Sequence, residues 1–283
     1  MKKILVIGST GKVGGVLTEA LVRAGQSVKA ATRSPERFTA SNGVEPVRFD
    51  YTDASTYASA LDGVDRIFMM EPQPSLDVAS DKRMIPFLEE AAKGDRKIVL
   101  MSSASVEYDD TEPLRRVEVA LERSGSAFVV LRPNWFMDNF HTWWLEPIKE
   151  ANVIPVPAAD ARSAFIDSRD VADCAAAVLL SDRFDKKTFT LTGPEALTYE
   201  QAAATLSKKS GREIQYVPID DESFTASLVD VGLPLDTAEY LTGLFRATRR
   251  GTAATPSKDV EALTGNKPRT LETYAEDNKL SWQ

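Results

Sequence analysis

The stretch ILVIGSTGKVGG (residues 4–15) decides the fold of this chain. Its first four residues are apolar and are followed by a glycine, a pattern that predicts a short buried strand. Apolar residues spaced by three and four then run from Val13 to Ala24 and predict a helix, which Gly25 ends. Between the two elements, glycines recur at positions 8, 11 and 14. The stretch therefore predicts a tight turn from a strand into a helix, where a ligand can approach the backbone closely.

The first half of the chain repeats this alternation of strand and helix patterns. Apolar runs predict further strands at 28–32, 44–49, 66–70, 98–101 and 128–131. Helical patterns lie between them at 54–61, 84–92 and 117–121. Pro86 falls inside the second helix and predicts a kink or a late start there. Because such crossovers give a parallel sheet covered by helices on both faces, we predict an α/β fold with a doubly wound parallel Rossmann sheet at 1–132.

The alternation of strand and helix patterns becomes less regular after Pro133. Aromatic residues and prolines fill 134–163, and the patterns that follow predict a helix at 167–180 and a strand at 188–192. The capping box at 198–201 predicts a helix that ends at Gly211, and the remainder predicts short helices. We expect 133–283 to form a smaller α/β substrate lobe that shares the core of the first domain and returns some segments to its sheet.

Composition excludes several classes of function. The net charge is −8 and the isoelectric point is near 5.0, with no strongly basic stretch, so nucleic acid is not expected as a partner. No apolar run is long enough to span a membrane. The single cysteine, Cys174, lies in an apolar helical pattern and is expected to be a buried structural thiol in a reducing compartment. We expect a cytoplasmic monomer or homodimer without a metal site.

The glycine turn predicts a binding site for a dinucleotide. Glycines at these spacings let a pyrophosphate approach the backbone, and the helix that follows directs free N–H groups and a partial positive charge toward the phosphates. A purely structural turn is the alternative. The residues expected to cradle the phosphates are Gly8, Thr10, Gly11, Lys12 and Val13.

The residues after the second predicted strand favour NADP(H) over NAD(H). NAD-selective proteins usually place an acid there to hold the ribose 2′-hydroxyl, but this chain has no acid before Glu36. Arg33 instead offers a planar fork for a 2′-phosphate, with Ser34 and Lys12 nearby in sequence. The alternative is that these cations are ordinary solvated surface charges.

Further contacts with the dinucleotide are expected at the carboxyl ends of the later strands. Asp50 follows the third strand and is expected to bind the adenine amino group. The other candidate cofactor contacts beyond each strand are Tyr51, Met70, Glu71, Ser102 and Pro133.

Together these pieces resemble the NmrA-like branch of the atypical short-chain dehydrogenase/reductases, over nearly the whole chain. The matching stretches are GSTGKVGG (8–15), ATRSP (31–35), FDYTD (49–53), VLMSSAS (99–105), LRPNWFMDNF (131–140), FIDSRDVA (165–172) and LTGNKPRTLETYA (263–275). The resemblance implies that the stretch 131–140 lies beside the nicotinamide and lines the substrate pocket. That family includes reductases of triphenylmethane dyes, quinones and clavine-type iminium ions, and also non-catalytic NADP sensors that bind transcription factors.

One departure from the pattern of extended short-chain reductases bears on the chemistry. Those proteins use a serine after the fifth strand and then a Tyr-x-x-x-Lys pair. Ser103 matches the serine, but the positions of the pair fall near Leu114 and Glu118. Tyr108 is close in sequence, yet Glu112 stands where its lysine would be. The usual proton donor is therefore absent or replaced.

A reductase without that donor is best suited to acceptors that need no proton. A ketone needs an acid to protonate its alkoxide, whereas an iminium ion or a triarylmethyl cation becomes neutral once it has taken a hydride. Aromatic residues, whose faces attract flat cations, cluster in and after the 131–140 stretch, although each of them can equally be a core residue. The members of this cluster are Trp135, Phe136, Phe140, Trp143 and Trp144. His141, the only histidine, is a candidate proton donor, although a lone histidine is more often structural.

The sequence leaves three hypotheses for the function. The first is an NADPH-dependent reductase of a small, flat organic electrophile such as an iminium ion, cationic dye or quinone, with Ser103 and His141 as candidate catalytic residues. The second is a non-catalytic NADP(H)-sensing protein that binds a protein partner. The third is a reductase of neutral quinones, with water or His141 as the proton source. The sequence also suggests an internal ion pair between Arg132 and Glu118.

Overall fold

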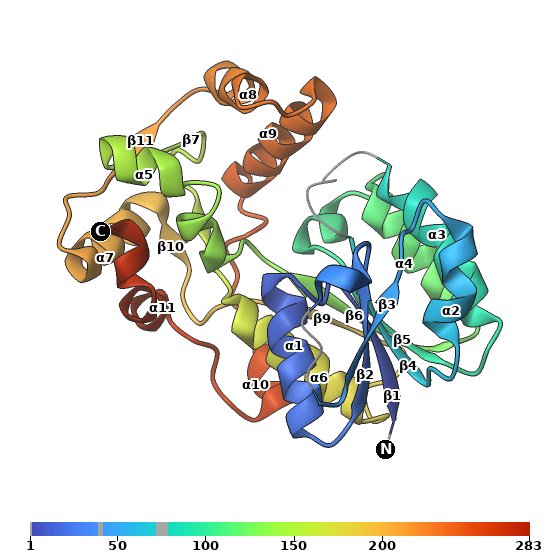
Figure 1. Cartoon of the computed structure of the whole chain (residues 1–283). Coiled ribbons are helices and arrows are strands. Elements are labelled where there is room, and N and C mark those ends of the chain that lie inside the picture. Colours follow the sequence, from blue (N-terminus) through green and yellow to red (C-terminus); the bar gives the residue numbers. More distant parts are fainter. Residues whose placement is uncertain (1, 39–41, 72–78) are drawn as a thin grey trace. The chain divides into compact units, whose positions relative to one another are not determined.

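The computed structural model describes residues 2–38, 42–71 and 79–283 (Figure 1). The chain divides into two compact units. The first contains Met1–Arg132 and Arg169–Thr190, and the second contains Pro133–Ser168 and Leu191–Gln283. The helix and strand at the end of the first unit are thus separated in sequence from the rest of it.

A seven-stranded sheet forms the centre of the first unit, in the order β3-β2-β1-β4-β5-β6-β9. The strands are β1 (Lys3–Ile7), β2 (Ser27–Thr32), β3 (Val44–Arg48), β4 (Arg66–Met70), β5 (Lys97–Met101), β6 (Ala127–Pro133) and β9 (Lys187–Leu191). Neighbours from β3 to β6 pair in parallel. The central residues of β1, β4, β5 and β6 are almost fully buried, which is why these strands appear in the sequence as continuous apolar runs, whereas β3 at the edge of the sheet is only partly buried. The predicted α/β fold with a doubly wound parallel sheet is confirmed.

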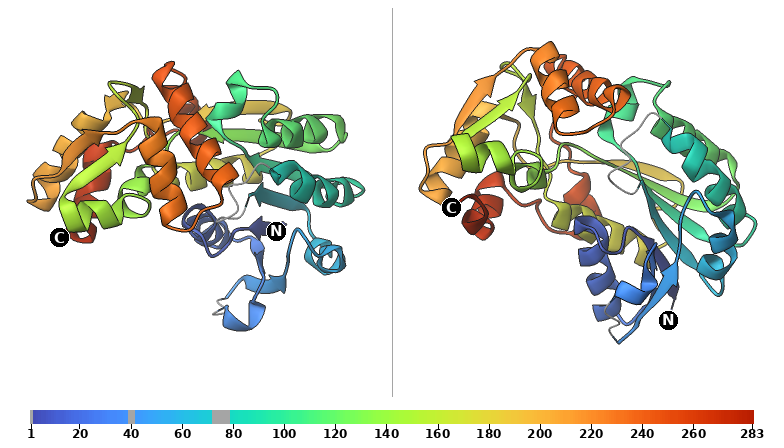
Figure 2. Two further views of the ribbon diagram at one scale, coloured as in Figure 1. Left: turned by 90° about the horizontal axis from the view of Figure 1, so that it is seen from above. Right: turned by 45° about the horizontal axis from the view of Figure 1, so that its top comes forward.

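Helices cover both faces of this sheet (Figures 1 and 2). One face carries α1 (Lys12–Arg23) and α6 (Ser168–Leu180), and the other carries α2 (Tyr57–Leu61), α3 (Ser80–Ala92) and α4 (Pro113–Arg123). Short 3₁₀ turns precede or connect them: η1 (Pro35–Arg37), η2 (Ala54–Thr56) and η3 (Ala104–Tyr108). Helix α3 begins well before Pro86, so the alternative of a late start at that proline was wrong.

The second unit combines short strands with helices. Strand β7 (Val153–Val156) pairs in parallel with β11 (Gln215–Pro218), and β8 (Arg162–Ser163) pairs antiparallel with β10 (Leu197–Thr198). The helices are α5 (Leu145–Ala151), α7 (Tyr199–Ser210), α8 (Asp221–Asp230), α9 (Leu235–Arg249), α10 (Asp259–Thr264) and α11 (Leu271–Asp277), with 3₁₀ turns η4 (Met137–His141) and η5 (Lys279–Trp282). The predicted capping box opens α7, and Gly211 ends it. The expectation of only short helices in the last third was wrong, since α9 has 15 residues.

Aromatic rings pack against one another in the core of the second unit. Tyr199 lies at the centre of this aromatic core, with ring centroids of Trp144, Phe165 and Phe245 between 5.3 and 5.9 Å away. Burial strongly raises the pKa of the Tyr199 hydroxyl, which therefore stays protonated. Helix α9 contributes Phe245 and lies against α8 (Figure 2).

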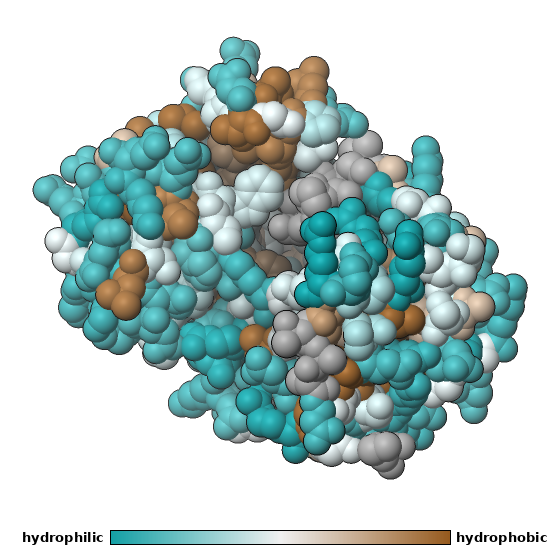
Figure 3. All heavy atoms as spheres, in the orientation of Figure 1, coloured by the Kyte–Doolittle hydropathy of each residue, from teal (hydrophilic) through white to brown (hydrophobic). Residues whose placement is uncertain are grey.

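Exposed apolar side chains gather where α8 meets α9. Val229, Val231 and Leu235 are 40%, 68% and 57% exposed. Figure 3 shows hydrophobic surface, in brown, over these two helices. Over the described residues, no helix combines the length and the apolar character needed to cross a membrane. The same residues contain no group of three or more His, Cys, Asp and Glu arranged to hold a metal ion.

Candidate cofactor site and active site

The glycine turn between β1 and α1 is closed by its own backbone. The Gly11 amide donates to the Gly8 carbonyl at 2.8 Å, and the Gly15 amide donates to the Gly11 carbonyl at 2.8 Å. Gly8 has a positive φ of 78°, which a residue with a side chain rarely adopts. A Cβ atom on Gly14 would lie 2.1 Å from the Gly8 carbonyl oxygen. Glycine is therefore required at both positions for this turn to form.

The turn leaves the N-terminus of α1 open to an anion. Gly11 is the residue before the helix, so no side chain caps the first amides, and no acidic residue lies in the first turn. Thr10, Gly11 and Lys12 are exposed, whereas Val13 is buried against the sheet. Uncapped amides at the end of a helix with this dipole are the arrangement that binds a phosphate group. These residues therefore fit the pyrophosphate of a dinucleotide.

The turn lies at the point where the strand order reverses. Strand β1 pairs with β2 on one side and with β4 on the other, so the segments that follow β1 and β4 adjoin. The Met70 side chain, at the end of β4, packs directly against Gly8. The next residue, Glu71, is buried and accepts a hydrogen bond from the Arg83 guanidinium at 2.6 Å. In open α/β sheets, ligands bind at this switch point, beyond the carboxyl ends of the strands.

Arg33 and Asp50 lie near one another beyond β2 and β3. The Arg33 side chain is exposed, and its charge, together with that of Arg48, helps to lower the pKa of the Asp50 carboxyl. The main cause of that lowered pKa is the hydrogen bond from the Thr52 amide, at 2.9 Å. Asp50 is therefore ionised at neutral pH. An adenine amino group would donate to the same carboxylate that accepts the hydrogen bond from the Thr52 amide.

The side chain of Tyr51 supports the site from inside. It is buried, and its hydroxyl donates to the Met70 carbonyl at 3.0 Å. The Tyr57 hydroxyl in turn donates to the Tyr51 carbonyl at 2.5 Å. The Tyr51 hydroxyl therefore links the ends of β3 and β4.

Ser102 and Ser103 follow β5 at the same edge of the sheet. The Ser102 amide donates to the Leu131 carbonyl of β6 at 2.8 Å, and its side chain is buried. Ser103 is half-buried, and its hydroxyl shares a hydrogen bond of 2.9 Å with the Ser105 hydroxyl. Pro133, the last residue of β6, is buried as well. The sequence therefore predicted correctly that these residues lie at strand ends.

The positions where a Tyr-x-x-x-Lys pair would stand are occupied by structural side chains. Leu114 packs against the hydrophobic core beneath α2, α3 and α4. Glu118 has no exposed surface and accepts two hydrogen bonds from Arg132, at 3.0 and 2.7 Å. The predicted ion pair of Arg132 with Glu118 is confirmed. The side chain of Tyr108 lies outside the described part of the chain.

The aromatic residues predicted as a pocket wall have different surroundings. The indole N–H of Trp135 donates to the Thr248 hydroxyl at 2.9 Å, and its ring packs 4.7 Å from that of Phe245. Phe136 is half-buried and Trp143 is exposed. Phe140 is 0% exposed and packs inside the aromatic core, so it offers no surface to a substrate and does not remain a candidate contact.

His141 is joined to the last helix. Its Nδ1 atom is hydrogen-bonded to the Tyr274 hydroxyl of α11, and the two rings are stacked with centroids 5.6 Å apart. The neighbouring Phe140 carbonyl accepts a hydrogen bond of 2.7 Å from the Trp282 indole. The turn that carries His141 is thus attached to the C-terminal segment at two points.

Several of these partners gave no signal in the sequence. Thr248 and Tyr274 are separated from Trp135 and His141 by more than a hundred positions, and nothing in their local pattern pairs them. The packing of Met70 against Gly8 likewise appears only once the sheet order is known. Met70 is the last residue of a predicted strand, which was the only available signal.

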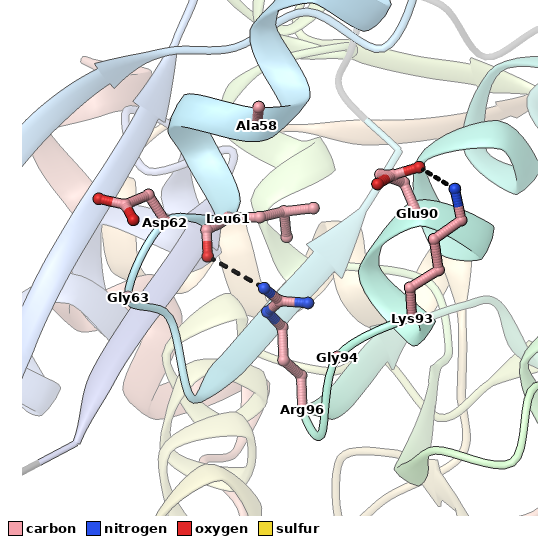
Figure 4. A pocket seen from close by; sticks show the side chains of 8 residues that line it. All are labelled: Ala58, Leu61, Asp62, Gly63, Glu90, Lys93, Gly94 and Arg96. Atoms are coloured by element: carbon pink, nitrogen blue, oxygen red, sulfur yellow. Dashed lines mark hydrogen bonds and ion pairs between the residues drawn. The ribbon is translucent and has the colours of Figure 1, made fainter.

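A hollow of about 350 Å³ lies elsewhere in the first unit, and Figure 4 shows the side chains that line it. It is lined by the loops that enter β4 and β5, including Asp62, Gly63, Lys93 and Gly94. Arg96 lies across it and donates to the Leu61 carbonyl at 3.3 Å. This hollow is at the amino ends of the strands, opposite the edge where the glycine turn lies.

Comparisons with known proteins identify the family. The profile of the NmrA-like family matches residues 1–275. Agroclavine dehydrogenase of Claviceps fusiformis is 31% identical over 291 residues, which cover 99% of this chain and 98% of that protein. The uncharacterized oxidoreductase YesF of Bacillus subtilis (strain 168) is 31% identical over 280 residues, or 99% and 96% of the two chains. The crystal structure of an Escherichia coli NADPH-dependent quinone oxidoreductase complexed with NADPH has a TM-score of 0.83 at 26% identity, covering 97% of this chain and 99% of that one. The resemblance seen in the sequence is confirmed, and the chain belongs to the NmrA-like family.

Proposed function

We propose that this chain is an NAD(P)H-dependent oxidoreductase that prefers NADPH and reduces a small, flat organic electrophile. The observation that carries the proposal is the turn of uncapped amides at the switch point, in a chain that aligns over almost its whole length with an oxidoreductase and a dehydrogenase. Arg33, where an NAD-selective protein would have an acid, supports the preference for the 2′-phosphate.

The proposed cofactor contacts follow the sheet edge. Gly8 to Val13 bind the pyrophosphate, Arg33 and Lys12 bind the 2′-phosphate, and Asp50 binds the adenine. Beyond β4, β5 and β6, the cofactor is flanked by Met70, Glu71, Ser102 and Pro133. Ser103, Trp135, Phe136 and Trp143 remain the proposed contacts near the reacting atoms, because each has exposed or half-exposed surface.

The residues at 114 and 118 favour acceptors that need no acid. Leu114 has no proton to give, and the Glu118 carboxylate is held by Arg132 in a buried ion pair. Bound NADPH supplies the hydride, so the residues of this chain orient the acceptor and exclude water from it. An iminium ion or dye cation then leaves as a neutral product. A neutral quinone needs a proton as well, and water is the proposed source because His141 is hydrogen-bonded to Tyr274.

The test is to follow NADPH absorbance with the purified chain and a panel of acceptors. The panel contains an iminium ion, a triphenylmethane dye, a quinone and a simple ketone, and a reaction without acceptor gives the background rate. We expect saturable oxidation with a cation or a quinone and none with the ketone. Turnover of the ketone alone would contradict the proposed chemistry, since it requires an acid.

A second candidate is a binding protein that senses the redox state of NADP(H). The loss of the Tyr-x-x-x-Lys pair supports it, because a sensor needs no proton donor. Calorimetry separates the two functions. Tight binding of NADP⁺ and NADPH without oxidation of NADPH by any acceptor would favour the sensor and overturn the enzyme.

A further inference from the structure

Glu118 is a buried carboxylate for which the proposed chemistry has no use. It lies on α4 with no exposed surface, and it accepts hydrogen bonds from three guanidinium nitrogens. Arg132 contributes two of them as a fork, and Arg115 contributes the third at 2.8 Å. Burial acts to raise the pKa of Glu118, but the hydrogen bonds and the charge of Arg132, together with the hydrogen bond from Arg115, outweigh it and lower the pKa. Glu118 is therefore ionised at neutral pH.

The ion pair stands at the ends of two neighbouring strands. Arg132 is the penultimate residue of β6, directly before Pro133, and Ser102 follows β5. The Ser102 amide donates to the carbonyl of Leu131, the residue before Arg132. Glu118 thus joins α4 to the end of β6, and the Leu131 carbonyl joins that strand to Ser102 after β5, at the carboxyl edge of the sheet where ligands bind.

The position within the strand order indicates which half of a dinucleotide this edge serves. A doubly wound sheet consists of two mononucleotide-binding halves that meet at the switch point. The glycine turn and Arg33 belong to the half built from β1, β2 and β3. The ion pair belongs to the half built from β4, β5 and β6. The second half therefore serves the nicotinamide mononucleotide.

We propose that Glu118 and Arg132 form a positioning pair that shapes the binding surface for the nicotinamide half of the cofactor. The inference rests on the proposed function, since it assumes that NADP(H) is the ligand. The two hydrogen bonds to Glu118 fix the orientation of the Arg132 side chain at the end of β6. They thereby help to fix Pro133, the next residue, and Ser102, whose amide is bonded to the preceding residue. Glu118 also neutralises the Arg132 charge. This matters because the oxidised nicotinamide ring is a cation and the reduced ring is neutral.

The test measures three dissociation constants by calorimetry for Glu118→Gln. Adenosine 2′,5′-bisphosphate probes the adenosine half alone, NADPH adds the neutral nicotinamide, and NADP⁺ adds the cationic one. We expect unchanged affinity for the bisphosphate, about tenfold weaker NADPH, and a larger loss for NADP⁺, because Arg132 is no longer neutralised. A purely structural role would weaken all three by one common factor.

A milder variant covers the case in which Glu118→Gln does not fold. Arg132→Lys keeps the charge but loses the fork, so NADPH and NADP⁺ should weaken equally while the bisphosphate affinity is unchanged. The matched control is Asp182→Asn, which breaks the ion pair of Asp182 with Arg66 at the opposite edge of the sheet and should alter none of the three.

The outcomes distinguish this inference from the function on which it rests. If the unmodified chain binds neither NADPH nor NADP⁺, the proposed function fails and the role of the pair fails with it. If the unmodified chain binds both, and both variants keep all three affinities or lose them by one common factor, the function stands and the positioning pair is overturned.

Discussion

The Met70 sulfur lies 2.6 Å from the point that a Cβ atom on Gly8 would occupy. Gly8 also has a positive φ, so an alanine there meets both backbone strain and a side-chain clash. We expect Gly8→Ala to cost about 1–2 kcal/mol from the backbone alone, and to weaken NADPH binding because the turn must shift. Chemical denaturation and calorimetry measure the two effects.

The chain offers matched controls for this substitution. Gly25 also has a positive φ, but nothing lies within 4 Å of its Cβ position, so Gly25→Ala should show the strain without the loss of NADPH binding. Adding Met70→Ala to Gly8→Ala should recover part of the stability. No recovery would show that the sulfur is not the obstacle.

Arg33 is expected to discriminate between NADPH and NADH. Arg33→Ala removes the planar fork next to Asp50 and should weaken NADPH by about tenfold or more while leaving NADH nearly unchanged. Arg37→Ala is the matched control, because Arg37 is an exposed arginine in the turn that follows. Titrations with both nucleotides measure the ratio of dissociation constants. An equal loss of affinity for NADPH and NADH in Arg33→Ala would show that Arg33 does not bind the 2′-phosphate.

The stability of the fold should depend on the ionisation of Glu118. Its folded-state pKa is lowered below the ordinary glutamate value of about 4.3, so its stabilisation is complete above that pH and is lost as the pH falls through the folded value. Glu118→Gln should therefore cost about 3–5 kcal/mol at pH 7 and progressively less below pH 4.

Thermal unfolding across the pH range measures this difference. Glu89→Gln, which changes an exposed carboxylate on α3, serves as the control and should follow the unmodified chain at every pH. If the stability lost in Glu118→Gln did not decrease in acid, the ion pair would not be the source of that loss.

The sequence predicted the first unit far better than the second, for a physical reason. Strands buried on both faces need apolar residues at every position, so β1, β4 and β5 appear as unbroken runs. Strands β8 and β10 have two residues each, too few for any pattern to emerge. The glycine turn was predictable because its geometry excludes side chains at fixed spacings.

Helix α9 buries polar as well as apolar residues, which weakens its hydrophobic pattern in the sequence. Three of its buried residues are threonines: Thr237, Thr242 and Thr248. The hydroxyls of Thr242 and Thr248 donate to carbonyls one turn earlier, at 2.9 Å, which satisfies them inside the protein. The threonines share the buried face with Ala238, Leu241 and Phe245, so the apolar pattern of the helix is weakened in the sequence. Thr248 then remains able to accept the hydrogen bond from Trp135, a contact that only the fold reveals.

His141 is expected to anchor the C-terminal helix rather than to supply protons. Its Nδ1 is hydrogen-bonded to Tyr274, a buried residue of α11, so changing either residue removes this buried hydrogen bond. We expect His141→Gln and Tyr274→Phe each to cost about 1–3 kcal/mol of stability. Their turnover of a cationic acceptor and of a neutral quinone should fall by one common factor, since only the folded fraction changes. Steady-state rates with both acceptors, together with thermal unfolding, measure this. A selective loss of quinone turnover in His141→Gln, with Tyr274→Phe unaffected, would instead identify His141 as the proton donor, because only the neutral acceptor needs one.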